Sequence, residues 1–325
     1  MIPHRLARRL ASLGLAASLL VAGALPAWAQ GNGQTTHVIT TSFGPAAASD
    51  LISRLLATEF SQQFGQNWVV KNIAGAAGTI AANEVVRARP DGTNLLLSPI
   101  GPVTVQPSFM ANAGYRTEDL LPICMTTRFP LVLMTHRTSG LDTVAKVVER
   151  ARASRDALNF GSTGSGTLPH LSMVTFGRLA GIPLVHVSYR GPSEVQIALE
   201  QGGVQLYADL PNLVLTDPSF QAVAVMAPER NPRFPDLPTM REAGYDLDFS
   251  IWQGLFAPRG TPPAIIARYE AACEKATRAP AVIAGHERLL MPVTYRGAED
   301  FAAIAAADAA RARRIIEEGR LRQAE

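Results

Sequence analysis

Short apolar segments alternate with stretches of helical periodicity along almost the whole chain, and this alternation restricts the fold more than any other feature. The apolar segment 37–41, for example, precedes a stretch in which Leu51, Leu55 and Phe60 recur at helical spacing. Strand and helix patterns follow each other at about 25 to 30 residues, which is typical of βαβ units. The sequence therefore predicts an α/β protein with parallel sheets.

The predicted elements fall into two sets of βαβ units. The segments 130–135 and 250–257 are predicted to be the strands that cross between the sets. We therefore expect two α/β lobes, with residues 30–133 plus 251–325 in lobe 1 and 134–250 in lobe 2. The predicted strands are 37–41, 68–70, 95–97, 130–135, 158–160, 184–187, 204–208, 221–226 and 250–257, and the main helices 79–89, 141–153, 171–179, 193–200, 264–276 and 298–318.

Residues 1–29 have the pattern of a secretory signal peptide. Residues 1–9 carry three arginines and no acid, an apolar run follows at 10–25, and Ala27-Trp28-Ala29 has the small–x–small form of a cleavage site. The apolar run is shorter than the roughly 20 residues that a single-pass anchor needs. We expect cleavage after Ala29 and a periplasmic location.

The charge balance gives no reason to expect a nucleic-acid or membrane partner. The chain has 30 Lys and Arg against 27 Asp and Glu, and three of the arginines lie in the predicted leader. The mature chain is therefore close to neutral, and it has no basic run with interleaved aromatic residues. We expect no interaction with nucleic acid.

The two cysteines, Cys124 and Cys273, lie far apart in the sequence. An oxidising compartment permits a disulfide between them. However, Cys124 stands at a predicted strand start and Cys273 in a helical pattern, and the sequence does not show that they meet. Two buried free thiols are the favoured interpretation, and pairing stays open. No Cys/His pair has the spacing of a zinc site, so we expect no metal.

The segment Asn159–His170, NFGSTGSGTLPH, has the pattern of a strand end, a turn and a helix start at Leu168. Gly161, Gly164 and Gly166 allow positive φ and a close approach of the backbone to a ligand. Free N–H groups at a helix start favour an anion. The functional interpretation is that this loop holds a carboxylate, and the alternative is an ordinary strand-to-helix turn.

The segment Ser42–Asp50, SFGPAAASD, is a second junction of this kind. Asp50 has two open interpretations, a first-turn acid that complements the helix dipole or a group that binds a polar or cationic ligand atom. Together the two junctions predict a site with two sides.

Four other positions also have two interpretations each. His170 is a helix histidine that hydrogen-bonds its surroundings, or it orients the loop and touches a ligand. Asp209 caps the following short helix or faces a cleft. Tyr189-Arg190 is a solvated turn or offers a cation to an anion, and Trp252 packs in the core or stacks on a ligand.

Motifs of the common enzyme classes are missing from the sequence. It has no G-x-S-x-G nucleophile elbow, no phosphate-binding loop that ends in Gly-Lys-Ser/Thr, no H-E-x-x-H and no complete dinucleotide fingerprint. We therefore expect a protein that is not an enzyme and has no cofactor. The remaining enzyme hypothesis uses Asp50 or His170 as an acid–base group.

Several ordered motifs resemble the solute receptors of tripartite tricarboxylate transporters, also called Bug receptors. The resemblance extends from about Val38 to Gly319. It depends on the motif P-F-x-P-G-G-x-x-D and six further motifs, which correspond to Ser42–Asp50, Asn72–Ala81, Pro90–Leu96, Asn159–His170, His186–Gly191, Pro235–Gly244 and Trp252–Pro262.

The resemblance implies a type II periplasmic-binding-protein fold, with two lobes and a ligand cleft between them. It implies a monomeric receptor that captures a small organic anion, in most members a carboxylate, and delivers it to membrane permease subunits. A sensory receptor for a membrane signalling partner is the alternative. The implied ligand-binding residues are Phe43, Ala46, Ala47, Ala48, Asp50, Ser162, Thr163, Gly164, Gly166, Thr167, His170, Tyr189 and Asp209.

Two departures from the family pattern affect the ligand. The family's Gly-Gly is Ala46-Ala47 here, and alanine keeps the N–H donors but disfavours positive φ. We therefore expect another turn geometry or a smaller or less polar ligand at this loop. Ile73-Ala74 replaces an Arg-Pro pair, which removes a cation near the second turn.

Overall fold

The first of two sheets is built around strands whose side chains are buried on both faces. The computed structural model describes residues 35–153 and 157–322, so the predicted signal peptide lies outside the described part. The sheet has the order β11-β4-β10-β3-β1-β2. Leu95, Leu96 and Leu97 of β3 are fully buried, which is typical of a wholly apolar strand that is covered on both faces. Its strands are β1 His37–Thr41, β2 Trp68–Asn72, β3 Asn94–Pro99, β4 Leu120–Pro130, β10 Ser250–Pro258 and β11 Val293–Arg296.

The second sheet has the order β7-β6-β8-β5-β9. Strands β7, β6 and β8 are parallel to one another, so their carboxyl ends share one edge of the sheet. The prediction of an α/β protein with two sheets is therefore confirmed. The strands are β5 Val132–His136, β6 Leu158–Ser162, β7 Leu184–Ser188, β8 Leu206–Asp209 and β9 Phe220–Val225.

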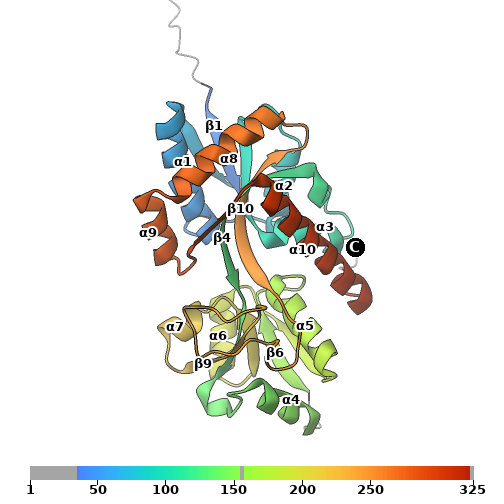
Figure 1. Cartoon of the computed structure of the whole chain (residues 1–325). Coiled ribbons are helices and arrows are strands. Elements are labelled where there is room, and N and C mark those ends of the chain that lie inside the picture. Colours follow the sequence, from blue (N-terminus) through green and yellow to red (C-terminus); the bar gives the residue numbers. More distant parts are fainter. Residues whose placement is uncertain (1–34, 154–156, 323–325) are drawn as a thin grey trace, which may run out of the picture. The chain divides into compact units, whose positions relative to one another are not determined.

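Neither sheet is purely parallel, and on this point the sequence prediction was wrong. Strand β10 runs antiparallel to β3 and β4, and β5 runs antiparallel to β8 and β9. The reason is the chain path. Strand β4 leads from the first sheet into the second and β10 returns, so the two lie side by side in opposite directions (Figure 1).

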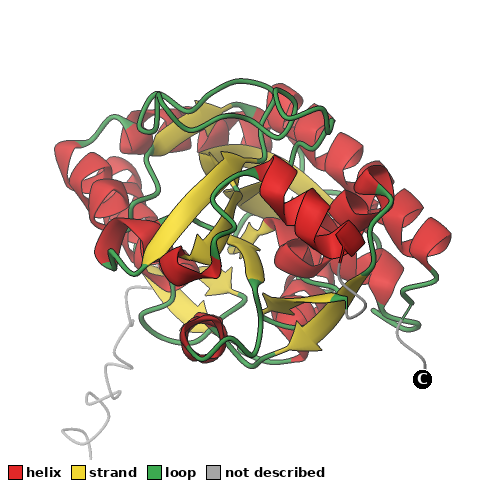
Figure 2. Cartoon of the chain, turned by 90° about the horizontal axis from the view of Figure 1, so that it is seen from below, coloured by secondary structure: helices red, strands yellow, loops and turns green. Residues whose placement is uncertain are grey.

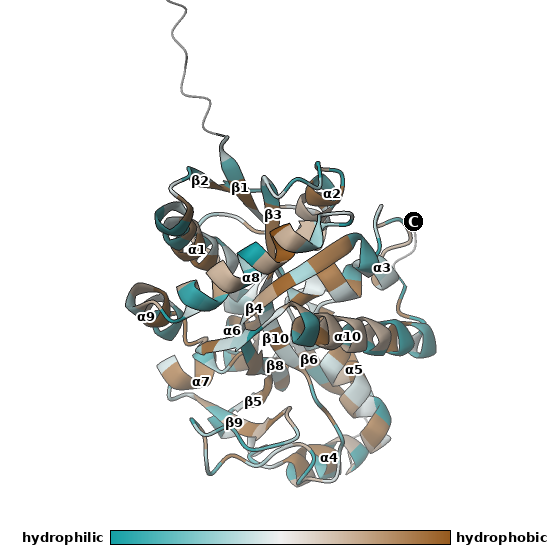
Figure 3. Cartoon of the chain, turned by 45° about the horizontal axis from the view of Figure 1, so that its top comes forward, coloured by the Kyte–Doolittle hydropathy of each residue, from teal (hydrophilic) through white to brown (hydrophobic). Residues whose placement is uncertain are grey.

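Helices flank the strands of both sheets (Figure 2). Helix α1 packs Ile52, Leu56 and Phe60 into the core beside β2. Hydrophobic residues follow the strands, and hydrophilic residues occupy the outer turns of α10 (Figure 3). The helices are α1 Ala48–Phe64, α2 Thr79–Val86, α3 Gln106–Phe109, α4 Val144–Ala153, α5 Leu168–Ala180, α6 Pro192–Glu200, α7 Asn212–Thr216, α8 Pro263–Thr277, α9 Pro280–Arg288 and α10 Ala298–Gly319.

Some elements were not predicted. Helix α9 and strand β11 stand between the two closing helices, and a π-helical turn at Gly101–Val105 precedes α3. Strand β4 begins at Leu120, so Cys124 lies inside a strand and not at a strand start. Within the described ranges no helix has the length and apolar character needed to cross a bilayer.

The chain passes between the sheets at Leu131 and again at Phe249. Leu131 N–H donates to the Phe249 carbonyl at 2.8 Å, and Phe249 N–H donates to the Met226 carbonyl at 3.0 Å. Trp252 follows on β10 and is fully buried, and its indole N–H donates to Asp308 of α10 at 3.0 Å. Trp252 therefore packs in the core, one of its two interpretations.

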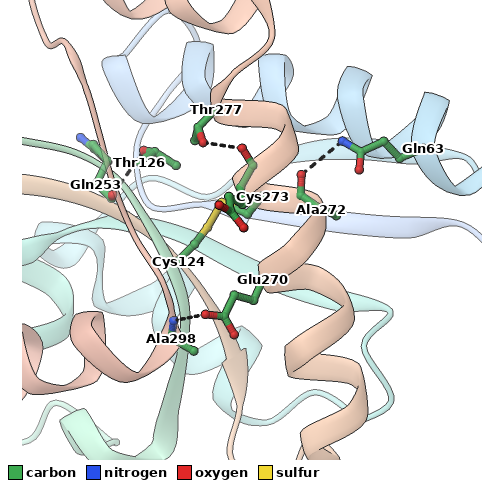
Figure 4. The surroundings of a disulfide bond; sticks show 10 residues. Gln63, Cys124, Thr126, Gln253, Glu270, Ala272, Cys273, Thr277 and Ala298 are labelled. Atoms are coloured by element: carbon green, nitrogen blue, oxygen red, sulfur yellow. Dashed lines mark hydrogen bonds between the residues drawn. A yellow bond between two sulfur atoms is a disulfide. The ribbon is translucent and has the colours of Figure 1, made fainter.

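Cys124 and Cys273 form a disulfide, which corrects the favoured interpretation of two free thiols. Cys273 lies on the buried face of α8, which packs on β4, and the two Cα atoms are 6.6 Å apart (Figure 4). Cys273 on α8 and Cys124 on β4 are 149 positions apart in the chain. Local patterns carry no information about such a long-range contact.

Removal of the disulfide should lower the free energy of unfolding by about 3–5 kcal/mol, because the bond closes a long loop in the unfolded chain. Denaturant unfolding with and without reductant measures the difference. Alkylation of the denatured, unreduced protein tests the pairing directly: it should label no cysteine, and labelling of both would contradict the disulfide.

Candidate functional site

The loop between β1 and α1, Ser42–Asp50, is held in shape by the Asp50 carboxylate. This side chain is 2% exposed, accepts three hydrogen bonds and forms an ion pair with Arg54. Oδ2 accepts from Ala46 N–H at 2.9 Å and from Arg54 Nε at 3.2 Å. Oδ1 accepts from Asn72 Nδ2 at 2.9 Å and lies 3.0 Å from Arg54 Nη2. These three hydrogen bonds and the ion pair engage both carboxylate oxygens, so the geometry gives Asp50 a positioning role.

The charge state of Asp50 follows from the same contacts. Burial alone would raise the pKa of its carboxyl, but the hydrogen bonds from Arg54, Asn72 and Ala46, with the Arg54 charge, outweigh burial and lower the pKa. The group is therefore ionised at neutral pH. Asn72 also donates to the Phe43 carbonyl at 3.1 Å, which fixes the start of the loop.

Ala46 adopts φ of 66°, the left-handed region that its alanine side chain disfavours. Alanine thus adopts here a conformation that it disfavours, at the position where the family pattern has glycine. Ala46 N–H donates to Asp50, and Ala47 N–H approaches the Gly44 carbonyl at 3.3 Å. Both donors are thus occupied within the loop. Ala48 is the first residue of α1, and Phe43 is exposed.

The second loop, Asn159–His170, pairs many of its polar groups internally. Gly164 N–H donates to Ser162 Oγ at 3.2 Å, and Thr167 Oγ1 donates to the Gly164 carbonyl at 2.7 Å. Gly166 N–H donates to His170 Nδ1 at 3.0 Å. These bonds involve residues that the family resemblance implied as ligand-binding. They give the loop a defined shape.

Two stacked histidines contact this loop. The rings of His170 and His186 are stacked at 4.0 Å, and His186 Nε2 lies 2.7 Å from Ser162 Oγ. Burial, with the nearby His186 as a second cause, lowers the pKa of His170 to about 4. His170 is therefore neutral at neutral pH. Its Nδ1 can accept from Gly166 because that nitrogen carries no proton.

Some donors of the second loop remain available. Within the described residues, the N–H groups of Thr163, Ser165 and Leu168 and the hydroxyls of Thr163 and Ser165 have no hydrogen-bond partner in the protein. Leu168 begins α5, whose dipole places partial positive charge at this end. The arrangement can hold an anion without a basic side chain.

Gly166 also brings the second loop into contact with helix α3. A Cβ atom at Gly166, which has φ of 74°, would stand 2.5 Å from the ring of Phe109 on α3. Only glycine fits this contact. Gln106 Nε2, also on α3, approaches the Gly166 carbonyl at 3.5 Å. In the described part of the chain no hydrogen bond joins the second loop directly to Ser42–Asp50.

Tyr189 and Asp209 lie at the carboxyl ends of β7 and β8, beside the second loop. Tyr189 N–H donates to the Ser162 carbonyl at 2.9 Å. Asp209 accepts from the hydroxyl of Tyr207 and from Leu210 N–H. Asp209 does not cap the following helix, because Pro211 holds the N-cap position of α7. The Arg190 side chain is exposed.

The sequence interpretation missed the residues that hold the two loops. Arg54 is one turn after Asp50, and this i,i+4 spacing of opposite charges was an available signal. His186 acts through a contact between neighbouring strands, which no local pattern indicates. Tyr207 contacts Asp209 two residues later on the same strand. Ser165 is not among the ligand-binding residues that the family resemblance implied. Within the described ranges no cluster of three or more His, Cys, Asp or Glu side chains could hold a metal.

Comparison with known proteins places the chain in a family. The model of the tripartite tricarboxylate transporter family receptor matches residues 52–321. The chain belongs to this receptor family. BugT of Bordetella pertussis is 31% identical over 249 residues, which cover 74% of this chain and 76% of BugT. A protein encoded in the tcbD–tcbE intergenic region of Pseudomonas sp. strain P51 is 30% identical over 86% of this chain and 84% of its own length.

Solved structures agree on the fold. A TctC solute-binding protein from Polaromonas superposes with a TM-score of 0.77 at 23% identity, and covers 87% of this chain and 98% of its own. MatC from Rhodopseudomonas palustris, solved with bound malate, gives 0.73 at 27% identity over 86% and 98%. The predicted periplasmic-binding-protein fold and the receptor family are both confirmed, and the neighbours are solute-binding proteins, not enzymes.

Replacement of Ala46 by Gly should stabilise this receptor by about 0.5–1 kcal/mol, since glycine releases the left-handed strain but costs more chain entropy. The control is Ala303→Gly, at an exposed position inside α10, which should destabilise the protein by about 1 kcal/mol. Denaturant unfolding of both variants measures the effects. Equal losses in the two variants would show that Ala46 is not strained.

Replacement of Asp50 by Asn should cost about 2 kcal/mol of stability at neutral pH, because charge-assisted bonds to Ala46 and Arg54 are lost. The folded pKa of Asp50 is lowered, so its contribution is present above the unfolded value of 3.8 and disappears as the pH falls through the folded pKa. The gap between wild type and variant should therefore shrink in acid.

The control for this pH dependence is Asp142→Asn. Asp142 forms an exposed i,i+4 pair with Lys146 and should contribute less than about 0.5 kcal/mol. Thermal unfolding of both variants across the acid range gives the comparison. A gap for Asp50→Asn that stays constant down to about pH 2 would exclude the ionised anchor.

Proposed function

We propose that this receptor binds a small organic carboxylate between the Ser42–Asp50 and Asn159–His170 loops. The observation that carries the proposal is the set of unpartnered donors at the start of α5. Thr163, Ser165 and Leu168 together offer three N–H groups and two hydroxyls. Such donors at a helix N-terminus favour an anion, and carboxylate oxygens accept several hydrogen bonds at once.

The relatives support a carboxylate as the ligand. MatC is described with bound malate, and the family is the receptor family of tricarboxylate transporters. We propose that this chain also binds a carboxylate, through the ligand-binding residues that the family resemblance implied. Within that set, the paired groups of Ala46, Ala47, Gly164 and Gly166 shape the loops, while Thr163 and Ala48 have donors that can meet the ligand.

The proposal includes the path of the ligand. The signal peptide, residues 1–29, directs the receptor to the periplasm and is cleaved after Ala29. A monomeric receptor then presents the carboxylate to the membrane permease subunits. The lobes are 30–133 plus 251–325 and 134–250, and they close over the ligand by rotation about the crossovers near Leu131 and Phe249.

A thermal-shift titration of the mature protein with mono-, di- and tricarboxylates tests the function. A bound carboxylate should raise the melting temperature progressively with concentration, as mass action requires. The variant Thr163→Val keeps the shape of the side chain but removes its hydroxyl. It should weaken binding about 10-fold, because one hydrogen bond to a charged group is lost.

Thr58→Val is the matched control. Thr58 is an exposed residue of α1, and its hydroxyl donates to the Arg54 carbonyl at 2.9 Å, away from the second loop. Its loss should leave the affinity unchanged. The proposal fails if no carboxylate stabilises the protein, or if both variants weaken binding equally.

A further inference from the structure

A cavity of about 240 Å³ opens at the carboxyl end of β8, beside the first turn of α6. Its polar lining consists of one acid and several neutral groups, and no lysine, arginine or histidine contributes to it. The polar lining residues are Ser193, Gln196, Tyr207, Asp209, Asn212 and Thr216. The cavity therefore accepts hydrogen bonds and offers no basic side chain to an anion.

The register of the second sheet places Asp209 close to the carboxylate loop. Strand β8 pairs in parallel with β6, with Tyr207 opposite Gly161. Adjacent strands are about 4.8 Å apart, and Asp209 stands two residues beyond this pair, where β6 passes into the loop. A Cβ atom on Gly161 would meet Val195 of α6 at 2.6 Å, so this side of β6 faces α6, as the cavity does.

The Asp209 carboxylate has hydrogen bonds but no counter-ion. It accepts from the hydroxyl of Tyr207 and from Leu210 N–H, and no ion pair of the described residues includes it. Burial raises the pKa of Asp209, and the hydrogen bonds offset this only in part. Asp209 is partly exposed where the cavity opens, and an acid in a cleft with a shifted pKa and no cation beside it is a candidate for a functional role.

We propose that this cavity receives the ammonium group of a zwitterionic ligand, an amino-carboxylic acid, with Asp209 as its counter-ion. The inference rests on the proposed function, because the Asn159–His170 loop holds the carboxylate of the same molecule. An ammonium group carries three donors, and Asp209 keeps free lone pairs for them. The Gln196 side chain donates to Glu200 and Asp217, which leaves its amide oxygen as a further acceptor.

A second carboxylate in the same place would be repelled. The ionised form of Asp209 would repel it, and no basic side chain among the lining residues would offset that repulsion. Like charges at close range oppose binding, so the cavity selects against dicarboxylates by repulsion and for amino acids by attraction. Asp209 is therefore a specificity-determining residue of this receptor.

Calorimetric titration of the mature wild-type protein with matched ligands tests the inference. The probes are propanoate, β-alanine and butanedioate, then butanoate, γ-aminobutyrate and pentanedioate, with L-alanine as an α-amino acid. At least one amino acid should bind about 10-fold or more tightly than the acid without the amino group. The dicarboxylate of the same set should bind more weakly than that amino acid.

The variant Asp209→Asn has nearly the same shape and lacks the charge. It should lose about 10-fold or more in affinity for the amino acid and should bind the dicarboxylate as well as or better than wild type. Asp246→Asn is the control, because Asp246 is 77% exposed and pairs with Arg241 on the surface. This control should change neither affinity.

The outcomes separate the two proposals. If dicarboxylates bind wild type more tightly than every amino acid, the ammonium site is excluded while the carboxylate receptor stands. If no acid of any kind binds, the proposed function fails as well. The wild-type comparison needs no variant, so it decides the question even if Asp209→Asn does not fold.

Discussion

Antiparallel pairing of β4 with β10 is the constraint on which both sheets depend. The pairing runs from Leu120 opposite Pro258 to Pro130 opposite Ser250, and the chain enters or leaves the second sheet directly beyond its end. The Cys124–Cys273 disulfide ties β4 to α8, and Trp252 ties β10 to Asp308 on α10. The first sheet is thus fixed around two strands that also define where the second sheet begins.

Both candidate loops obtain their shape from side chains buried beneath them. Asp50 holds Ala46 N–H in the first loop, and His170 holds Gly166 N–H in the second. Each bond spans four residues and connects the loop to the first turn of the helix that follows. A loop that is ordered before the ligand arrives loses little conformational entropy on binding. The donors left over, not the paired ones, are then available to the ligand.

The sequence predicted many of the strands and helices and both loops, because apolar periodicity and glycine-rich turns are local signals. It could not predict the disulfide, β11 or the antiparallel strands, which depend on contacts between distant segments. Ala46 shows the same limit on a smaller scale. Its intrinsic preference opposes φ of 66°, yet the loop keeps this conformation, in which Ala46 N–H donates to Asp50.

The protonation states of the two loop supports make the site insensitive to pH over a wide range. Asp50 has a lowered pKa and stays ionised, and His170, with a pKa near 4, stays neutral. Neither group changes charge between about pH 5 and 8, so the loops keep their hydrogen bonds there. Asp209 differs, because burial raises its pKa and only its hydrogen bonds oppose this. A cation from the ligand would favour its ionised form, which couples charge at Asp209 to occupancy of the cavity.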